Sequence, residues 1–546
     1  MKRKAVAAVL TAVMVASMFT GCGSDNGSSS AKSASAASAA SAANDTVDED
    51  GKVNGIMYQE GLPLVDEGDY TFSIFCDDSS ESGEFIMLDE FKKQTNVDVD
   101  LKIYPYETAT ERLNLDLNSG DYADVIGGWT LSDNAILTYG VNQGVFIPLE
   151  DYFEKYCPNI SAILDLPGVR EKMTAPDGHI YTIPYVCADS TVGYSPYINT
   201  KWLENVGMSM PTTTDEFEAV LKAFKEQDAN GNGDASDEIP FSTDPNNKHI
   251  EAMAGYFGLP MNKLGIAIQN EKVVYGGVSD TYREFLSWFH KLYAEGLVDV
   301  ELYTQDSSTW EGKGNQDLYG VSIAYGSNEF TGIPAAEERG DFDSMPVLNT
   351  DKDGIWLRDT EGFSVYGTEA VITNKAEHPE IICRWFDNAF ALENGIGCNR
   401  GPVGVIVNKE DDGYHAIDTT TLSEEDQEKY SWGNLWPQSL PKYLPVDFEF
   451  VEEHPMYDEK KATEEAYEAN LTKEIIPSYW IDLDKIDTFS DTNTAIKDFF
   501  EQQQAQFVCG ELDIDNDADW QAYVDGMYSL GLEDWVATQG IEEIAK

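Results

Sequence analysis

The chain has 546 residues, of which 42% are hydrophobic and 12% aromatic, and its formal net charge is -62. Its length exceeds what one hydrophobic core supports, so we expect two or more folded lobes. The large negative charge argues against nucleic acid as a partner, because phosphates are bound by Lys and Arg. It argues equally against recognition of anionic lipids or polyanionic substrates.

The chain begins with three basic residues, Lys2 to Lys4, followed by an apolar run from Ala5 to Phe19. The run is too short to span a bilayer and has the charge layout of a secretory signal. Its end, "FTGC", resembles the lipobox of bacterial lipoproteins, with Phe19 where leucine is usual. The resemblance implies that the signal is cut before Cys22 and that Cys22 carries the lipid, on the extracellular face of the bacterial cell membrane. The alternative is an ordinary secretory signal with an incidental cysteine.

Residues 23–52 consist mainly of Ser, Ala and Gly and offer almost nothing to bury. Such a segment is expected to be disordered, with a reach of roughly 30 Å. Six further cysteines are widely spaced and leave disulfides and free thiols as open alternatives. The six histidines form no motif typical of catalytic zinc.

The folded part opens with alternating strand and helix patterns. "YTFSIFC" (residues 70–76) alternates like a strand, "GEFIMLDEFKKQTN" has apolar residues at helical spacing, and "VDVDLKIY" alternates again. A second helix, "TERLNLDLNSG", leads to the strand "ADVIGGW". We therefore predict an α/β lobe with parallel strands, whose ligands bind beyond the carboxyl ends of the strands.

Several motifs resemble extracellular solute-binding proteins of the family-1, carbohydrate-importing type. These are "GDYADVIGGW", "GVFIPLEDYFEKYCPNI", "APDGHIYTIPY", "YINTKWLENVGMSMPTTTDEFEAVLKAFKEQDANGNG" and "FVCGELDIDNDADWQAYVDGMYSLGLEDW". The resemblance covers nearly the whole mature chain and is nearest to long lipoproteins that serve oligosaccharide importers. It implies a two-lobed periplasmic-binding-protein-like fold of type II, an oligosaccharide ligand, ABC importer membrane subunits as partners, no enzymatic activity and a monomer.

In that fold each lobe is discontinuous in sequence. We expect the first crossing near Tyr185 to Tyr194 and the return near Gly362 to Thr373, where "EGFSVYGTEAVIT" reads as another strand. The expected divisions are a signal peptide (1–21), the lipidated cysteine and tether (22–55), the first part of lobe 1 (56–190), the first part of lobe 2 (191–363), the return to lobe 1 (364–445) and a helical part mainly in lobe 2 (446–546).

The segment "DANGNGDASDEIP" (228–240) places oxygen-bearing side chains at alternate positions, and it follows a helix that Thr213 and Glu216 begin with a capping-box spacing. Calcium takes six to eight hard oxygen ligands, and this spacing lets a tight loop point them inward. The loop is not a complete EF-hand, because Ile239 stands where a bidentate Glu is usual, and the family resembled carries a similar loop. The alternative is a metal-free Asx/Gly turn. We predict a structural Ca²⁺ site formed by Asp228, Asn230, Asn232, Asp234, Asp237 and Glu238.

A sugar presents apolar CH faces, which flat aromatic rings cover, and hydroxyl groups, which polar side chains satisfy. Candidates lie at strand ends, by the hinge or in loops without apolar periodicity, although any tryptophan among them can serve packing instead. The predicted ligand-binding residues are Asp77, Trp129, Tyr185, Trp310, Tyr325, Glu329, Trp356, Trp432 and Trp436. Two other functions stay open: a receptor for peptides or other non-sugar solutes, and a glycan hydrolase, which needs two carboxylates at a set separation.

Replacing Cys22 by Ala is expected to move the protein from the membrane fraction to the soluble fraction, because the lipid would have no attachment site. Fractionation of cells that express the two forms measures this. Unchanged membrane association of the Cys22→Ala form would rule out the lipobox interpretation.

Overall fold

The computed structural model describes residues 45–78, 84–245, 250–332, 341–417, 419–451, 455–477, 480–481 and 485–545. Its buried apolar side chains form two main cores, each drawn from two separate stretches of chain. One core contains side chains from Val53 to Val186 and again from Ala370 to Leu440. The other contains side chains from Val192 to Trp356 and again from Tyr467 to Ile541. The chain thus forms two lobes, lobe 1 and lobe 2, that are each discontinuous in sequence, and the predicted two-lobed α/β fold is confirmed.

Lobe 1 is built on a four-stranded sheet in the order β14-β5-β3-β4. The strands are β3 (Tyr70–Asp77), β4 (Val97–Tyr104), β5 (Val125–Gly127) and β14 (Ala370–Ile372). β3 pairs in parallel with β4 over its whole length and with β5 on its other side, whereas β14 runs antiparallel to β5. The predicted parallel strand–helix–strand unit is therefore present, and the carboxyl ends of three strands meet at one edge.

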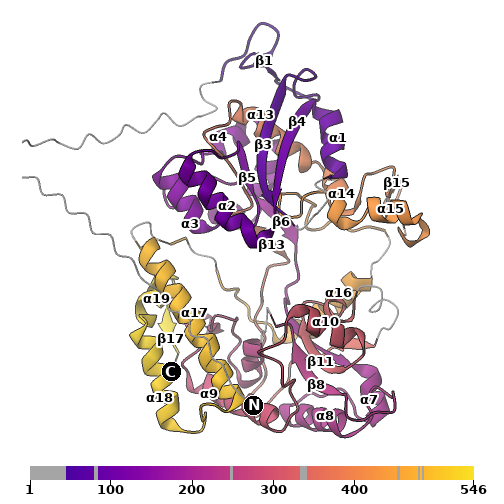
Figure 1. Ribbon diagram of the computed structural model, residues 1–546, viewed down its shortest axis with the longest axis vertical. Coiled ribbons are helices and arrows are strands. Elements are labelled where there is room, and N and C mark those ends of the chain that lie inside the picture. The colour runs from indigo at the N-terminus through magenta and orange to yellow at the C-terminus, as the bar shows by residue number, and fades with distance from the viewer. Residues whose placement is uncertain are drawn as a thin grey trace, which may run out of the picture. The chain divides into compact units, whose positions relative to one another are not determined.

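Helices surround this sheet, and Figure 1 shows early (indigo) and late (orange) parts of the chain packed together in lobe 1. The helices are α1 (Ile86–Thr95), α2 (Tyr106–Ser119), α3 (Asp133–Ala135), α4 (Glu150–Tyr156), α5 (Pro158–Leu164), α6 (Val169–Met173), α13 (Pro379–Ala389), α14 (Leu392–Arg400) and α15 (Glu424–Lys429), with a π-helical turn at Ile136–Asn142 and 3-10 turns at Thr419–Thr421 and Trp432–Asn434. Two small hairpins complete the lobe: β1 (Lys52–Val53) with β2 (Met57–Tyr58), and β15 (Val407–Glu410) with β16 (Gly413–Ala416).

Lobe 2 has a four-stranded sheet in the order β12-β7-β11-β8 and a three-stranded sheet in the order β17-β10-β9. The strands are β7 (Ser195–Asn199), β8 (Ile239–Thr243), β9 (Ile266–Gln269), β10 (Lys272–Tyr275), β11 (Tyr319–Ala324), β12 (Phe342–Ser344) and β17 (Glu543–Ile544). The helices are α7 (Thr200–Val206), α8 (Thr214–Glu226), α9 (Asp280–Ala294), α10 (Ser307–Asn315), α11 (Asn328–Thr331), α16 (Pro455–Tyr467), α17 (Ile486–Cys509), α18 (Asp517–Ser529) and α19 (Leu532–Thr538), with 3-10 helices at Ile250–Phe257 and Glu468–Asn470. The Thr213 hydroxyl accepts the Glu216 N–H at the start of α8, as the capping box predicts.

Core membership changes from one lobe to the other at a two-stranded antiparallel ribbon of β6 (Tyr185–Ala188) and β13 (Phe363–Tyr366). We call this pair the hinge ribbon. The single strand expected within residues 361–373 is wrong: the segment forms two strands in different sheets, β13 in the ribbon and β14 beside β5. Gly367, Thr368 and Glu369 separate them, because the chain must leave one sheet and enter another.

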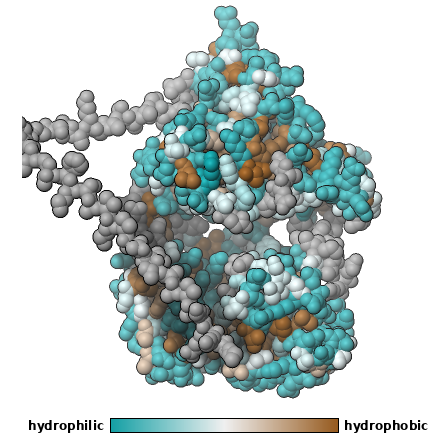
Figure 2. Space-filling model, viewed as in Figure 1, coloured by the Kyte–Doolittle hydropathy of each residue, from teal (hydrophilic) through white to brown (hydrophobic). Residues whose placement is uncertain are grey.

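The cysteines that the structure describes, Cys76, Cys157, Cys187, Cys383, Cys398 and Cys509, are free thiols. Cys22 and its lipid lie outside the described residues. No helix in the described part of the chain combines the length and apolar character needed to cross a bilayer. Figure 2 shows hydrophilic residues over most of the face in view, as expected from the net charge.

Trp385 lies at the centre of the lobe 1 core, fully buried on α13 and in contact with the rings of Phe72, Phe91, Phe386 and Trp436. Replacing Trp385 by Ala is expected to lower the free energy of unfolding by roughly 3–5 kcal/mol, because it removes a large ring from a packed core. Urea unfolding followed by circular dichroism measures the loss. The exposed Trp432→Ala variant is the control, and an equal effect in both variants would contradict this account.

Candidate functional site

Asp77, the last residue of β3, shapes the turn that follows β5. Its two carboxylate oxygens accept the backbone N–H groups of Trp129 at 3.0 Å and Thr130 at 2.6 Å, and the side chain is fully buried. Gly128 has a φ of 129°, and a Cβ atom at this position would lie 2.1 Å from Asp77 Oδ1, so the turn requires glycine. Asp77, which the sequence predicts to bind ligand, therefore fixes the backbone of Trp129 and Thr130. We call residues 127–130 the Trp129 turn.

The Trp129 side chain is 54% exposed at this turn. It stacks on Tyr106, with ring centroids 5.3 Å apart and planes 15° from parallel. Tyr106 is the first residue of α2 and follows the carboxyl end of β4. Since a second ring fixes its orientation, Trp129 provides a flat platform of the kind that suits the CH face of a sugar.

A second tryptophan, Trp432, is 55% exposed and is connected to the same end of β3. The Gln438 side-chain amide donates to the Trp432 carbonyl at 2.9 Å, and the Gln438 backbone N–H donates to Asp78 Oδ2 at 2.7 Å. Lys442 donates to Gln438 Oε1 at 3.0 Å, and its ammonium lies 5.3 Å from the centroid of the Trp432 ring. Lys442 is buried, and burial lowers its pKa to about 8.

The hinge ribbon contributes a third aromatic pair. Tyr185 and Tyr366 face each other in its register and stack, with centroids 5.4 Å apart. Tyr366 is 43% exposed, and burial of the rest of the residue raises its pKa to about 12. The predicted Tyr185 therefore supports an exposed ring that the sequence did not single out.

Tyr325 and Glu329 belong to a network at the start of lobe 2. The Tyr325 hydroxyl donates to Asp189 at 2.9 Å, and its backbone N–H donates to Glu329 Oε2 at 2.9 Å. Lys460 on α16 lies 3.9 Å from the centroid of the Tyr325 ring and donates to the carbonyls of residues 192 and 193. Burial lowers the pKa of Lys460 to about 8 and raises that of Glu329. Tyr325 thus contacts the chain just beyond the hinge ribbon, and Glu329 holds the backbone of Tyr325.

Three predicted tryptophans lie inside the cores, and their rings are covered by other side chains. Trp310 packs against Phe330, Trp356 against Tyr256, and Trp436 against Phe91 and Trp385. Their exposed fractions are 3%, 1% and 0%. The prediction that they offer ring faces to a ligand is corrected on this ground, because a buried ring has no free face.

Sequence reasoning missed Tyr106, Tyr366, Asp78, Gln438 and Lys442. Asp78 and Tyr106 follow the carboxyl ends of β3 and β4, so the rule that identified Trp129 also applied to them. Gln438 and Lys442 reach the site from a segment 360 residues further along the chain than Asp78, as the Gln438–Asp78 hydrogen bond shows. No local pattern marks such a contact.

The predicted metal loop follows α8. Asp228 Oδ2 accepts the Gly233 N–H, Asn230 Oδ1 accepts the Asn232 N–H, and Asn232 Oδ1 accepts the Asp234 N–H. These side-chain-to-backbone bonds wind residues 228–234 into a tight coil with Gly231 and Gly233 at positive φ. The Asp237 carboxylate accepts the side-chain amides of Asn230 and Asn232.

Two carboxylate oxygens of this loop are buried without a hydrogen-bond partner: Asp228 Oδ1 and Glu238 Oε2. Burial also raises the pKa of Glu238. Unpaired buried carboxylate oxygens are costly, and a hard divalent cation would satisfy both of them. The loop therefore fits calcium, with all six predicted residues on one loop and oxygen as the donor type.

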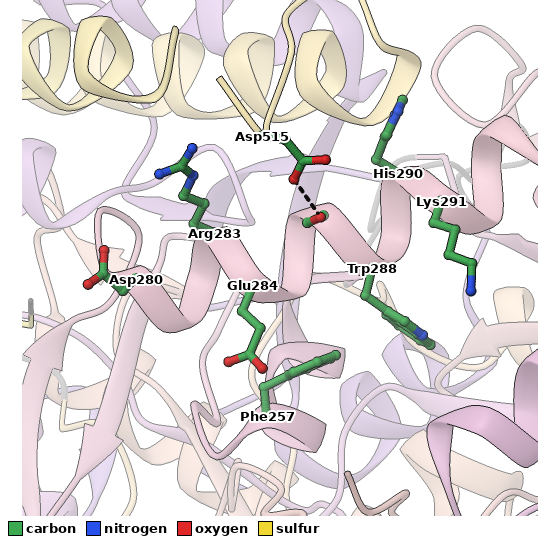
Figure 3. A pocket seen from close by; sticks show the side chains of 9 residues that line it. Phe257, Asp280, Arg283, Glu284, Trp288, His290, Lys291 and Asp515 are labelled. Carbon is green, nitrogen blue, oxygen red and sulfur yellow. Dashed lines mark hydrogen bonds between the residues drawn. The ribbon is translucent and has the colours of Figure 1, made fainter. Parts of the chain in front are cut away.

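Two other features lie apart from these residues. Glu410, Asp412 and His415 on the β15–β16 hairpin bring three possible metal ligands within 4.8 Å of one another, with both acids exposed. A surface hollow of about 820 Å³ lies along α9 and is lined by Phe257, Asp280, Arg283, Glu284, Ser287, Trp288, His290, Lys291 and Asp515. Figure 3 shows the side chains that line it. Polar groups here bond to one another, as Ser287 does to Asp515 at 3.0 Å. None of the predicted ligand-binding residues lines this hollow.

Comparisons with known proteins identify relatives of this chain in sequence and in fold. The family model described as bacterial extracellular solute-binding protein matches residues 78–395. The fructooligosaccharide ABC transporter substrate-binding protein FusA of Streptococcus pneumoniae is 31% identical over 73% of this chain and 70% of its own length. Lipoprotein LipO of Bacillus subtilis is 28% identical over 50% of this chain and 52% of its own length.

Solved structures of S. pneumoniae FusA show the same fold. The complex with kestose superposes with a TM-score of 0.74 at 26% identity and covers 86% of this chain and 98% of its own. A complex of a FusA EF-hand mutant with fructo-nystose also has a TM-score of 0.74, at 27% identity and the same coverage. The type II periplasmic-binding-protein-like fold expected from the sequence is thereby confirmed.

Calcium is expected to raise the melting temperature of this protein and a chelator to lower it, because the ion would satisfy the two unpaired oxygens. Occupancy at a hundred times the dissociation constant adds about 2.7 kcal/mol to the free energy of unfolding. Replacing Glu238 by Gln is expected to reduce this response in differential scanning fluorimetry, whereas Glu154→Gln, at an exposed position of α4, leaves it unchanged. If neither calcium nor the chelator changes the melting temperature, the loop is a metal-free turn.

Proposed function

Because the chain belongs to the bacterial extracellular solute-binding proteins, we propose that it binds an oligosaccharide between its two lobes and delivers it, unaltered, to the membrane subunits of an ABC importer. The observation that carries the ligand class is the pair of exposed tryptophans, Trp129 and Trp432, at one end of β3. They are the two tryptophans among the described residues that are more than half exposed. FusA, whose name and complexes give fructooligosaccharides as ligands, supports this class as the first to test.

The polar groups beside the rings are buried and fix the loop that carries Trp432. Gln438 is held by Asp78 and Lys442, so its backbone and side chain are already fixed before a ligand arrives. Fixed groups lose little conformational freedom on binding. The hinge ribbon adds Tyr366, so a sugar that contacts both lobes gains affinity in the closed form and shifts the population toward it.

Binding without reaction is favoured over hydrolysis by the state of Asp77. A glycosidase needs a carboxylate free to attack or to activate water. Both oxygens of Asp77 are engaged by backbone N–H groups and the side chain is buried. Asp77 is therefore not the free carboxylate of a hydrolase. The proposed role is that of a receptor, expected to be a monomer, and a peptide or another non-sugar solute is the alternative ligand.

The proposed location is the outer face of the cell membrane, through a lipid on Cys22. LipO, a lipoprotein by name, is a relative of this chain. A tether rich in Ser and Ala would let the lobes reach the importer while the lipid keeps them near the bilayer. Calcium in the loop of residues 228–238 has a structural role in this proposal, because the loop follows α8 and lies apart from the exposed rings.

Titration with a panel of oligosaccharides, kestose first, is expected to raise the melting temperature and to give a dissociation constant below millimolar. The ligand recovered afterwards should be intact by mass spectrometry. If no sugar of the panel binds and a peptide does, the protein is a receptor for peptides and not for oligosaccharides. Cleaved sugar would establish hydrolysis.

Replacing Trp129 by Ala is expected to weaken kestose binding by about 1 kcal/mol or more, roughly a factor of five, because the sugar loses its ring platform. Isothermal titration calorimetry measures the change. Tyr528→Ala, which removes an exposed ring (42%) on α18, is the matched control and should bind as the parent does. Equal affinities of parent and Trp129→Ala would remove Trp129 from the site.

A further inference from the structure

Glu369 occupies the join between the hinge ribbon and the lobe 1 sheet. It stands between β13, which ends at Tyr366, and β14, which begins at Ala370. Its backbone carbonyl accepts the Gly128 N–H of the Trp129 turn at 2.8 Å. Its side chain is 3% exposed, and its Oε2 atom is buried without a hydrogen-bond partner. A carboxyl in this condition is unusual, because buried polar atoms are normally paired.

The groups that face Glu369 come from three strands. Asp77 on β3 is the charged neighbour whose field acts on Glu369. Tyr185 and Cys187 on β6 and Tyr366 on β13 feel the charge of Glu369 in turn. Lys442, a buried cation, faces Cys187 and Asp78.

Both burial and the Asp77 charge disfavour an ionised Glu369. Burial removes water from the carboxylate, and Asp77 adds a like charge. Together they raise the pKa of Glu369 to about 7. The carboxyl is therefore mostly neutral below this pH and mostly ionised above it, whereas an exposed glutamate is already ionised well below neutral pH.

We propose that Glu369 is a positioning residue which, as an uncharged carboxyl, lets Asp77 hold the Trp129 turn, so that ionisation of Glu369 loosens this turn and weakens ligand binding. The Trp129 turn is tightly packed, because Gly128 lies directly against the Asp77 carboxylate. A second negative charge beside Asp77 is relieved by moving one carboxylate away from the other. Since Asp77 carries the N–H bonds of Trp129 and Thr130, its displacement moves the ring platform.

The charge of an ionised Glu369 also acts on the hinge ribbon. Tyr185 and Tyr366, the stacked pair of the ribbon, both face Glu369. Ionisation thus acts on the platform and on the ribbon from one buried position. The effect on affinity rests on the proposed function, whereas the effect on the turn does not.

The first experiment needs no ligand. The full chain is labelled with fluorotryptophan, the Trp129 signal is assigned with Trp129→Phe, and fluorine NMR spectra are recorded across the neutral pH range. We expect the Trp129 signal to titrate near the pKa of Glu369 in the parent and to stay constant in Glu369→Gln, which is neutral at every pH. A Trp129 signal that titrates identically in both proteins, or in neither, would overturn the proposal.

The second experiment measures kestose affinity over the same pH range. A ligand that raises the pKa of Glu369 by one unit loses about tenfold in affinity once the pH exceeds both pKa values. We expect such a fall with rising pH in the parent and a flat profile for Glu369→Gln at the low-pH affinity. An affinity of the parent that is constant or rises with pH would contradict the proposal.

Asp387→Asn is the matched control for this pH effect. Asp387 is also buried in lobe 1, and burial raises its pKa to about 6, but it bonds to Asn159 and Ile160 at α5. Its removal should leave the pH profiles of both experiments as in the parent. If kestose fails to bind at any pH, the proposed ligand is wrong, and the NMR titration still decides the role of Glu369.

Discussion

The candidate site depends on one buried carboxylate that accepts two backbone N–H groups. Asp77 ends a strand whose apolar side chains fill the lobe 1 core, so its position is set by the packing of β3. Hydrogen bonds from backbone N–H groups to an ionised carboxylate are stronger than hydrogen bonds between two neutral groups. Through them the sheet determines where Trp129 stands, and through Asp78 and Gln438 it also determines where the loop of Trp432 stands.

The aromatic residues of lobe 1 fall into two groups, buried rings and exposed rings. Rings that fill the cores, such as Trp385 and Trp436, stack on one another and have no free face. Rings at the strand end are exposed and held by a neighbouring ring or cation, as Trp129 is by Tyr106. Trp129 and Trp432 have exposed rings, and the proposed function assigns these free faces to contact with a sugar.

The sequence predicted those features that local patterns specify. Alternating residues identified β3 and β4, a capping box identified the start of α8, and the rule for strand ends led to Trp129. It did not distinguish Trp129 from Trp356, because burial depends on residues such as Tyr256 and Tyr467 that lie far away in the chain. It also merged β13 and β14 into one strand, since both are short and apolar and only the three-dimensional sheet order separates them.

The division of each core between two distant stretches of chain has a consequence for how the protein matures. The lobe 1 core needs Trp436 and Leu440, and the lobe 2 core needs side chains as late as Ile541. Neither lobe can complete its packing until most of the chain has been synthesised, whereas a protein with consecutive domains folds its first domain early. The N-terminal half can pair β3 with β4 and β5, but β14 joins this sheet only after the whole first part of lobe 2 has been made. Each lobe therefore depends on contacts between residues far apart in sequence, which slows folding.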